Sequence, residues 1–170
     1  MRTRPELTYG MLRDLLTYDP PTGVLRWVTR PANNVWRGDV AGTVTKRGYR
    51  MVRILGVNWL AHRLAWFWMT GRWPTEDIDH INGIKSDNRW CNLREATRAQ
   101  NIVNRPPGKN NTSGSRGVSF YRPSKKWRAQ LSNGTANRYI GTFNTKEDAE
   151  RAYNAAAKAV YGEFVYAVKA

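Results

Sequence analysis

The stretch IDHINGIKSDNRWCNLREATRAQN, residues 78–101, decides the local fold in the middle of the chain. Residues 78–80 predict a short strand, and the Asn- and Gly-rich residues that follow predict a polar loop. Residues 92–96 predict a second strand. Thr97 and Gln100 stand where a capping box places its two side chains, so a helix is expected to begin with Thr97 as its N-cap. The stretch therefore predicts a strand, a loop, a strand and a helix in succession.

The polar side chains of this unit combine oxygen ligands with a proton acceptor. Asp79 offers a carboxylate and Asn101 an amide carbonyl, and such hard oxygens suit Mg²⁺ or Mn²⁺. His80 can accept the proton of a water molecule, provided that its other ring nitrogen is held by a hydrogen bond. Asn92 is the candidate for that hold. A metal-dependent hydrolase of phosphodiesters needs these parts together.

Simpler interpretations of the same residues stay open. A His beside an Asp is often only a structural hydrogen-bonded pair, and the Asn-Gly and Asp-Asn pairs often mark only turns. Neighbours in a regular strand point to opposite faces. Asp79 and His80 can therefore share a site only if the strand twists or ends there.

The residues before this stretch predict two helices and a small antiparallel sheet. A helix is expected over 8–17, where Leu12, Leu15 and Leu16 have helical spacing, and a turn over 19–23 ends it. A second, buried helix is expected over 61–70. The expected strands are 24–29, 40–45 and 49–54, with a hairpin turn at 46–48.

After this stretch the composition changes. Residues 104–115 are rich in Pro, Gly, Asn and Ser without apolar periodicity, as in a linker. A long helix is expected to follow Asn144. The expected strands are 117–121, 127–131 and 139–143, with turns at 122–125 and 132–134.

The charge of the chain predicts a polyanionic partner. The 170 residues include 28 Lys and Arg against 13 Asp and Glu, a net charge of +15. Up to Arg105 there are 17 basic and 9 acidic residues, and after it 11 and 4, so both halves are basic. RNA would satisfy this charge as well as DNA.

The chain has one Cys and two His. Cys91 is expected to be a small buried residue, and an internal disulfide or a four-ligand zinc site of Cys and His is excluded. No apolar segment has the length of a signal peptide or a membrane span, so a cytoplasmic protein is expected. Of the eight Trp residues most are expected to pack in cores, although Trp beside Arg can also hold unpaired bases.

Five short motifs follow one another in the middle of the chain: Ala61-His62-Arg63-Leu64, Ile78-Asp79-His80-Ile81-Asn82-Gly83, Asp87-Asn88-Arg89, Asn92-Leu93-Arg94 and Gln100-Asn101. They resemble the motifs of the HNH endonucleases of bacteriophages and group I introns. The resemblance covers about residues 58–105 and implies His80 as general base and Asn92 as the residue that orients it. It implies Asp79 and Asn101 as ligands of one divalent cation, and Asn101 in place of a third His favours Mg²⁺ or Mn²⁺.

The last part of the chain contains Arg116-Gly117-Val118, Lys126-Trp127-Arg128-Ala129, Tyr139-Ile140-Gly141-Thr142-Phe143 and the helical residues 149–153. With these motifs, residues 112–166 are similar to the Apetala-two, or ethylene-response-factor, DNA-binding domain. That resemblance implies a three-stranded sheet backed by a helix, with the sheet in the major groove. Ser119, Phe120 and Tyr121 depart from the Arg- and Trp-rich first strand of plant versions, so base specificity does not transfer. For Trp127 two roles stay open, packing of the sheet on the helix or contact with DNA. In the earlier motif, His62 is expected to be structural. Across both resemblances the expected DNA contacts are Arg63, Arg89, Arg94, Arg116, Arg122, Lys126, Trp127, Arg128 and Arg138.

Together these features predict an α+β protein. A nuclease domain is expected over 1–105, with its strand-strand-helix metal motif at about 76–105, then a linker over 106–115 and a DNA-binding domain over 116–170. The expected function is that of a homing-type endonuclease that cuts or nicks double-stranded DNA in a bacterial or phage-infected cell, as a monomer or homodimer and without a small-molecule cofactor. The alternative is a DNA-binding regulator with a degenerate nuclease region.

Overall fold

The computed structural model describes residues 6–108, 110–132 and 136–165, and the chain forms two compact units, Met1–Glu95 and Ala96–Ala170. The boundary between the two units falls about ten residues before the linker expected at 106–115. Part of that expected linker packs within the second unit, where the Ser113 hydroxyl, 9% exposed, donates to the Val118 carbonyl at 2.7 Å.

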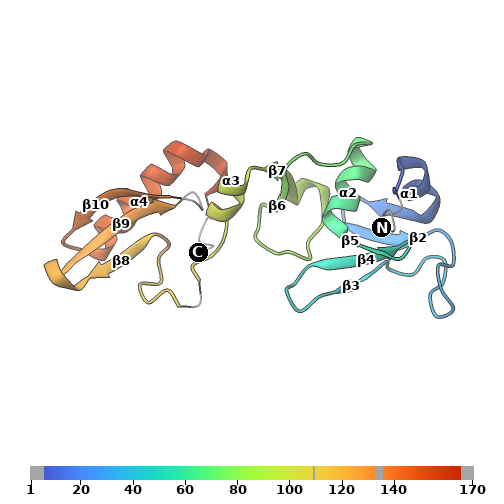
Figure 1. Ribbon diagram of the computed structural model, residues 1–170, viewed down its shortest axis with the longest axis horizontal. Coiled ribbons are helices and arrows are strands. Elements are labelled where there is room, and N and C mark those ends of the chain that lie inside the picture. The colour runs from blue at the N-terminus through green and yellow to red at the C-terminus, as the bar shows by residue number, and fades with distance from the viewer. Residues whose placement is uncertain (1–5, 109, 133–135, 166–170) are drawn as a thin grey trace, which may run out of the picture. The chain divides into compact units, whose positions relative to one another are not determined.

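The first unit begins with a helix and a hairpin. Helix α1, Tyr9–Leu15, is capped by Thr8, whose hydroxyl accepts from Met11 N at 3.3 Å. The helix is shorter than predicted, because Leu16 and the residues after it extend into β1, Leu16–Asp19. Strand β1 pairs antiparallel with β2, Val24–Trp27 (Figure 1). In β1 buried and exposed residues alternate, as in a strand with one covered face.

A three-stranded antiparallel sheet and a helix complete the core of the first unit. The sheet has the order β3-β4-β5, from Thr43–Val44, Arg50–Ile54 and Val57–Leu60. Helix α2, Ala61–Thr70, has the predicted bounds and ends at Gly71, whose φ of 72° is left-handed. The central core residues come from α1, β1, β2, β4 and α2, and include Leu12, Leu16, Leu25, Val52 and Leu64.

The quoted stretch folds as predicted. Strand β6, Asp77–His80, is followed by a loop, the short 3₁₀ helix η1, Trp90–Asn92, and strand β7, Leu93–Ala96. Strands β6 and β7 form a two-stranded sheet. Helix α3, Arg98–Val103, belongs to the second unit and begins with the predicted capping box of Thr97 and Gln100.

The second unit is a three-stranded antiparallel sheet against one long helix (Figure 1). The strands are β8, Val118–Tyr121, β9, Lys126–Ser132, and β10, Asn137–Phe143, in the order β10-β9-β8. The 3₁₀ turn η2, Arg122–Ser124, joins the first two strands. Helix α4, Lys146–Tyr161, is followed by η3, Gly162–Phe164. The turn expected at 132–134 lies mostly outside the described residues.

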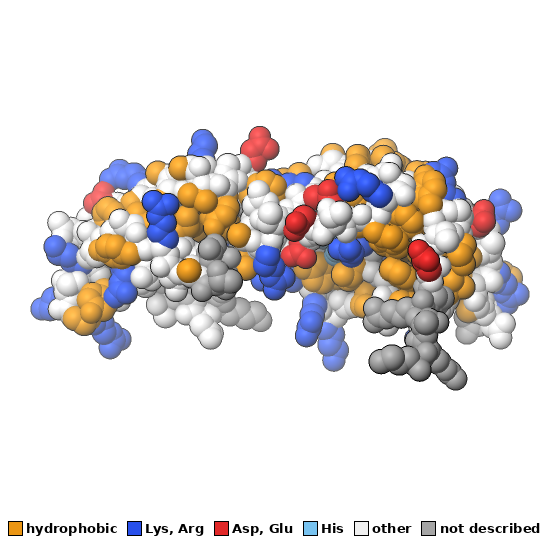
Figure 2. Space-filling view, turned by 45° about the horizontal axis from the view of Figure 1, so that its top comes forward, with side chains coloured by type: hydrophobic (Ala, Val, Ile, Leu, Met, Phe, Trp, Pro, Cys, Tyr) orange, Lys and Arg blue, Asp and Glu red, His pale blue; other side chains and the backbone are white. Residues whose placement is uncertain are grey.

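The predicted α+β class is therefore confirmed, with small antiparallel sheets in the first unit and a sheet packed on a helix in the second. Lys and Arg side chains are spread over the face drawn in Figure 2. Within the described residues no helix is long and apolar enough to cross a membrane.

Candidate active site

The site is built where β6 ends. His80 is the last residue of β6, and its carbonyl accepts from Gly83 N at 2.8 Å, which closes a tight turn. Gly83 adopts a φ of 72°, a left-handed conformation that favours glycine. Asp79 and His80, 4% exposed each, are thus held at a strand end, the condition under which they can share a site.

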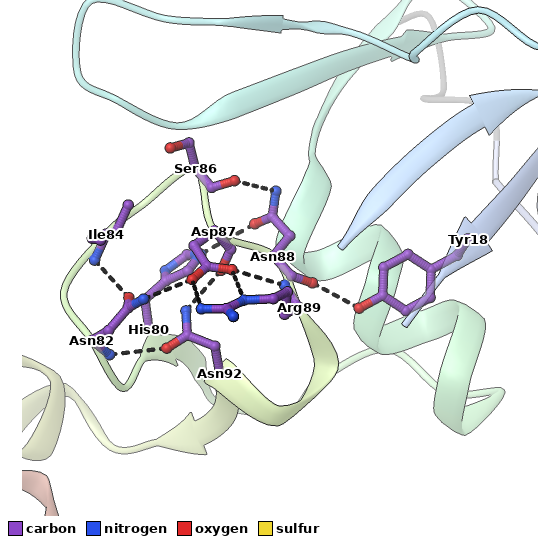
Figure 3. A network of polar contacts seen from close by, with 9 residues as sticks. All are labelled: Tyr18, His80, Asn82, Ile84, Ser86, Asp87, Asn88, Arg89 and Asn92. Atoms are coloured by element: carbon purple, nitrogen blue, oxygen red, sulfur yellow. Dashed lines mark hydrogen bonds and ion pairs between the residues drawn. The ribbon is translucent and has the colours of Figure 1, made fainter. Parts of the chain in front are cut away.

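The imidazole of His80 is oriented by Asn88. His80 Nε2 lies 3.1 Å from Asn88 Oδ1, while Asn88 Nδ2 donates to the Ser86 carbonyl at 3.3 Å (Figure 3). With its amide nitrogen committed to Ser86, Asn88 presents an acceptor to His80, so Nε2 carries the proton and Nδ1 is the basic nitrogen. Burial lowers the pKa of His80, although the Asn88 hydrogen bond and the Asp79 charge oppose that shift. The ring is therefore neutral at physiological pH.

Asn88 is itself held by the β1–β2 hairpin. The Tyr18 hydroxyl donates to the Asn88 carbonyl at 2.7 Å, and Trp90 N donates to the Pro20 carbonyl at 3.0 Å. Gly23, at a φ of 72°, comes so close that an added Cβ would lie 2.3 Å from Arg89 N. Asn88 is 2% exposed. The hairpin therefore supports the backbone that places the His80 partner.

Asn92 fixes the loop between β6 and β7. Its Oδ1 accepts from Asn82 N at 2.9 Å, and its Nδ2 donates to the Asp87 carbonyl at 2.7 Å (Figure 3). We expected Asn92 to hold the His80 ring directly, but the contacts described for its side chain run to the loop backbone. Asn88 makes the described contact to the ring, while the orienting role expected of Asn92 stays a prediction.

Asp87 and Arg89 form a two-point ion pair in the same loop. Arg89 Nε donates to Asp87 Oδ1 at 2.8 Å and Nη2 to Oδ2 at 2.6 Å. These hydrogen bonds lower the pKa of the Asp87 carboxyl to about 2. Asn82 Nδ2 also donates to Asp87 Oδ2, at 2.7 Å. These contacts of the Arg89 guanidinium stabilise the loop, and the expected contact of Arg89 with DNA stays a prediction.

Asp79 is paired with Arg94 across β6 and β7. Arg94 donates to Asp79 Oδ2 through Nε at 3.0 Å and approaches it through Nη2 at 2.9 Å. Both side chains are largely buried, with Asp79 5% and Arg94 16% exposed. Asn101 lies on α3 in the second unit, and its pairing with Asp79 around one cation stays a prediction.

His62, on α2, packs edge-on against His80. The two ring centroids are 5.0 Å apart at 90°, and the Tyr49 ring lies 5.5 Å from that of His62. Burial, together with the neighbouring His80 and Arg63, lowers the pKa of His62 to about 3. His62 therefore packs beside His80 as an uncharged ring, in keeping with the structural role expected for it.

The donor chemistry fits a hard cation with few protein ligands. No group of three His, Cys, Asp or Glu side chains able to hold a metal occurs among the described residues. Mg²⁺ commonly takes one or two carboxylates and completes its shell with water and substrate phosphates. Asp79 supplies a carboxylate of that kind beside His80.

The comparisons with known proteins fall on this region. Residues 60–103 match the HNH endonuclease family. The chain is also 31% identical over 120 residues, 70% of its length, to a protein of Acanthamoeba polyphaga mimivirus named as an uncharacterized HNH endonuclease. The chain spans 62% of the length of that relative. No solved structure matches the chain at a significant level.

Within residues 60–103 the arginines expected to contact DNA bond acceptors of the chain itself, and their contact with DNA stays a prediction. Arg63, expected to reach a phosphate, donates to the backbone carbonyls of Pro74 at 3.1 Å and Glu76 at 3.3 Å. Arg94, expected to contact DNA, pairs with Asp79. The described contacts of Arg63, Arg89 and Arg94 therefore stabilise the region that matches the HNH family. Cys91, expected to be buried, is exposed.

In the second unit the expected DNA contacts divide between two faces of the sheet. Trp127 lies on the face of the buried Ala129 and Leu131, with the Phe120 ring 5.3 Å away, so packing explains it. Arg116 donates to the Arg105 carbonyl at 2.7 Å. Lys126 and Arg128 alternate with these buried residues on the other face, and the Arg128 guanidinium lies 4.1 Å from the Tyr121 ring centroid. Arg122 and Arg138 are exposed.

Sequence reasoning missed Asn88, Tyr18 and Gly23 as parts of the site. The Asp87-Asn88-Arg89 motif was the available signal for Asn88, because a polar triplet in a loop can bond a nearby side chain as well as turn the chain. Nothing in the local sequence of Tyr18 or Gly23 points to a contact some 70 residues away.

Proposed function

We propose that this chain is a DNA endonuclease that hydrolyses a phosphodiester bond of duplex DNA with His80 as the general base. The observation that carries the proposal is the 3.1 Å contact of His80 Nε2 with Asn88 Oδ1, which orients a ring whose pKa is lowered by burial and which follows Asp79 directly in the chain. A general base needs a free-base form and a defined orientation at working pH, and this pair supplies both. The match of residues 60–103 to the HNH endonuclease family supports the same reaction class.

In the proposed reaction a water molecule attacks phosphorus in line with the departing 3′ oxygen. His80 accepts the proton of that water at its basic ring nitrogen, while Asn88 holds the opposite nitrogen. The bond from phosphorus to the 3′ oxygen breaks, and that oxygen takes a proton from solvent. The products carry a 5′ phosphate and a 3′ hydroxyl.

Asp79 and Asn101 are the proposed ligands of one divalent cation, Mg²⁺ or Mn²⁺. Such a cation stabilises charge on the phosphate oxygens and on the leaving oxygen. Arg94 fixes the Asp79 carboxylate through its two contacts to Oδ2. A buried carboxylate held in this way keeps its orientation, which favours a preorganised ligand.

We propose that the second unit tethers the nuclease to a longer DNA site, as expected from its likeness to Apetala-two domains. Its sheet carries Lys126 and Arg128 on the face opposite the core, a β-sheet surface of the kind that can enter a major groove. Two linked DNA contacts raise the overall affinity without new chemistry. This arrangement would suit a homing-type enzyme, and one active site per chain would nick one strand.

The test is cleavage of supercoiled plasmid and of a library of random duplex sites by the full chain. We expect nicked or linear product with Mg²⁺ or Mn²⁺ and none with chelator, and 5′-phosphate and 3′-hydroxyl ends on the product. Tight binding without any metal-dependent break across the library would instead support the DNA-binding regulator.

A further inference from the structure

The loop between β2 and β3 presents an aromatic side chain to solvent on a rigid base. We define the Arg–Trp loop as residues 29–38, the first part of the connection between β2 and β3 in Figure 1. Trp36 is 58% exposed, and Tyr139 alone among the described large apolar side chains is equally exposed. The other described Trp side chains are half-buried or buried. An exposed Trp offers a large flat apolar ring together with an N–H donor, and for this reason Trp is enriched at binding interfaces.

A cation covers one face of the Trp36 ring. The Arg30 guanidinium lies 4.0 Å from the ring centroid, within the range of a cation–π contact. Arg30 Nη2 also donates to the Asn33 carbonyl at 2.6 Å, which fixes the guanidinium in place. The pair therefore presents a flat apolar ring and a positive charge side by side.

Hydrogen bonds hold the loop in one conformation. Trp36 N donates to Asp39 Oδ2 at 2.8 Å, and Asp39 N donates to the Trp36 carbonyl at 3.1 Å. Gly38 N donates to the Trp27 carbonyl at 2.8 Å, and Arg26 Nη1 donates to the Gly38 carbonyl at 2.8 Å. A loop that is already ordered loses little entropy when it binds.

The two sides of the loop differ in character. Pro31, Ala32 and Val35 line an apolar hollow together with residues of β4, and Val35 packs against the core. The remaining side chains include Arg30, Trp36 and Arg37, all exposed. Between residues 20 and 75 there is one acidic residue, Asp39, against nine Lys and Arg.

From this exposure, rigidity and charge we infer that the Arg–Trp loop is a DNA-contacting surface of the nuclease unit, with Trp36 packed on a groove wall and Arg30 and Arg37 on phosphates. Duplex DNA is the partner that fits, because its phosphates match the guanidinium groups and its sugars and base edges offer apolar surface to the ring. The inference rests on the proposed function in that the partner is DNA, and it adds a second contact in the first unit.

The test measures binding of a labelled 30-base-pair random-sequence duplex by fluorescence anisotropy, with full-length protein in chelator so that no cleavage intervenes. We expect Trp36→Ala to weaken binding at least about fivefold and Trp36→Phe to restore much of it. We expect Arg30→Ala and Arg37→Ala each to reduce the slope of log affinity against log salt by about 1. Circular dichroism and thermal unfolding check that each variant is folded.

Arg72→Ala is the matched control, because Arg72 is 59% exposed in the same unit and its removal changes the net charge equally. Equal weakening by Arg72→Ala, Arg30→Ala and Arg37→Ala would overturn the inference, since the loss of one charge would then explain the effect of the two loop arginines. Unchanged duplex binding by Trp36→Ala would overturn it as well, and so would a loss confined to single-stranded DNA.

Cleavage assays separate this inference from the proposed function. A chain that never cuts DNA but loses duplex binding through Trp36→Ala would refute the nuclease and support the loop contact. If the parent chain cuts DNA and its Trp36→Ala variant binds duplex as tightly as the parent, the nuclease would be supported and the loop contact refuted.

Discussion

At the scale of single residues, the candidate site depends on how amides and imidazoles share their hydrogen bonds. Asn88 donates from Nδ2 to the Ser86 carbonyl and presents Oδ1 as the acceptor to His80. Asn92 instead uses both ends of its amide on the loop backbone, since Oδ1 accepts from Asn82 N and Nδ2 donates to the Asp87 carbonyl. One amide therefore sets the tautomer of the ring and the other sets the loop around it. This division gives distinct expectations for the two side chains.

Replacement of Asn88 tests its role as a positioning residue. We expect Asn88→Ala to lower the single-turnover cleavage rate about tenfold to 100-fold with little change in DNA affinity, because the partner that orients the base is lost. Asn88→Asp is the informative companion. A carboxylate beside Nε2 stabilises the imidazolium and raises the pKa of His80, so the rise of rate with pH should move to higher pH. An equal loss of cleavage rate in Asn88→Ala and Asn88→Asp, without a shift of the pH–rate profile to higher pH, would indicate only a structural role for Asn88.

The buried neutral His62 makes stability depend on pH. Its pKa in the folded chain is about 3 against an ordinary 6.5, so between these values the unfolded chain binds more protons. Stability is therefore fully present above about pH 6.5 and falls as pH decreases, by up to about 1.4 kcal/mol per pH unit from this one group. His80, whose pKa is also lowered, adds a contribution of the same sign.

Urea unfolding between pH 4 and pH 8 measures this dependence. We expect His62→Phe, which keeps an aromatic ring but does not titrate, to have a shallower decline below pH 6.5 than the parent chain. Identical slopes for the two proteins would contradict a buried neutral His62.

At the scale of secondary structure elements, the β1–β2 hairpin supports the loop between β6 and β7 that carries Asn88. Tyr18 and Pro20 bond the backbone around Asn88 and Trp90, and Gly23 packs against the backbone of Asn88 and Arg89. The hairpin contributes no side chain to the chemistry proposed here. It places the peptide that carries Asn88.

Gly23→Ala tests that support. The added Cβ would meet Arg89 N at 2.3 Å and Asn88 C at 2.4 Å, and backbone atoms cannot move aside as a flexible side chain can. We expect a stability loss of about 1–3 kcal/mol and a cleavage rate reduced with it. Gly56→Ala is the matched control, because Gly56 has a similar φ of 78° but no atom within 4 Å of the added Cβ. A cleavage rate equal to that of Gly56→Ala would contradict the proposed support.

Much of this element structure was predictable because its signals are local. Helix α2 and the capping box of α3 agree with the predictions, since helical periodicity and the Thr97–Gln100 pair act within a few residues. Strand β1 was missed, because Leu15 and Leu16 suit a helix as well as a strand. The partners of Arg63 and Arg94 were missed because their acceptors depend on tertiary contacts. The position of His80 was predictable, and its hydrogen-bond partner was not.

At the scale of the whole molecule, the basic residues fall into two kinds. Arg63, Arg89, Arg94 and Arg116 bond acceptors within their own unit, while Arg37, Lys126 and Arg128 present charge on exposed or half-buried surfaces. A count of basic residues predicts a polyanionic partner but not which residues meet it. Removal of residues of the second kind should therefore affect binding most.

Arg128→Ala tests the sheet face of the second unit. We expect it to weaken duplex binding and lower the salt dependence while the cleavage rate at saturating DNA is unchanged, because Arg128 lies in the unit proposed to tether and not to cut. Arg151 lies on α4, and its side chain is 79% exposed. Arg151→Ala is therefore the charge-matched control and should bind duplex within about twofold of the parent. Equal weakening by both substitutions would argue against a specific sheet contact.

The central claim is that His80 is the base of a metal-dependent DNA hydrolysis, and a comparison of His80→Ala with the parent chain tests it most directly. Single-turnover cleavage and duplex binding are measured on the same DNA, with Mg²⁺ or Mn²⁺ for cleavage and chelator for binding. We predict that His80→Ala loses at least about 100-fold in rate, the scale of a general base, while its affinity for DNA stays within a few fold. Cleavage by His80→Ala at the parental rate would contradict the account.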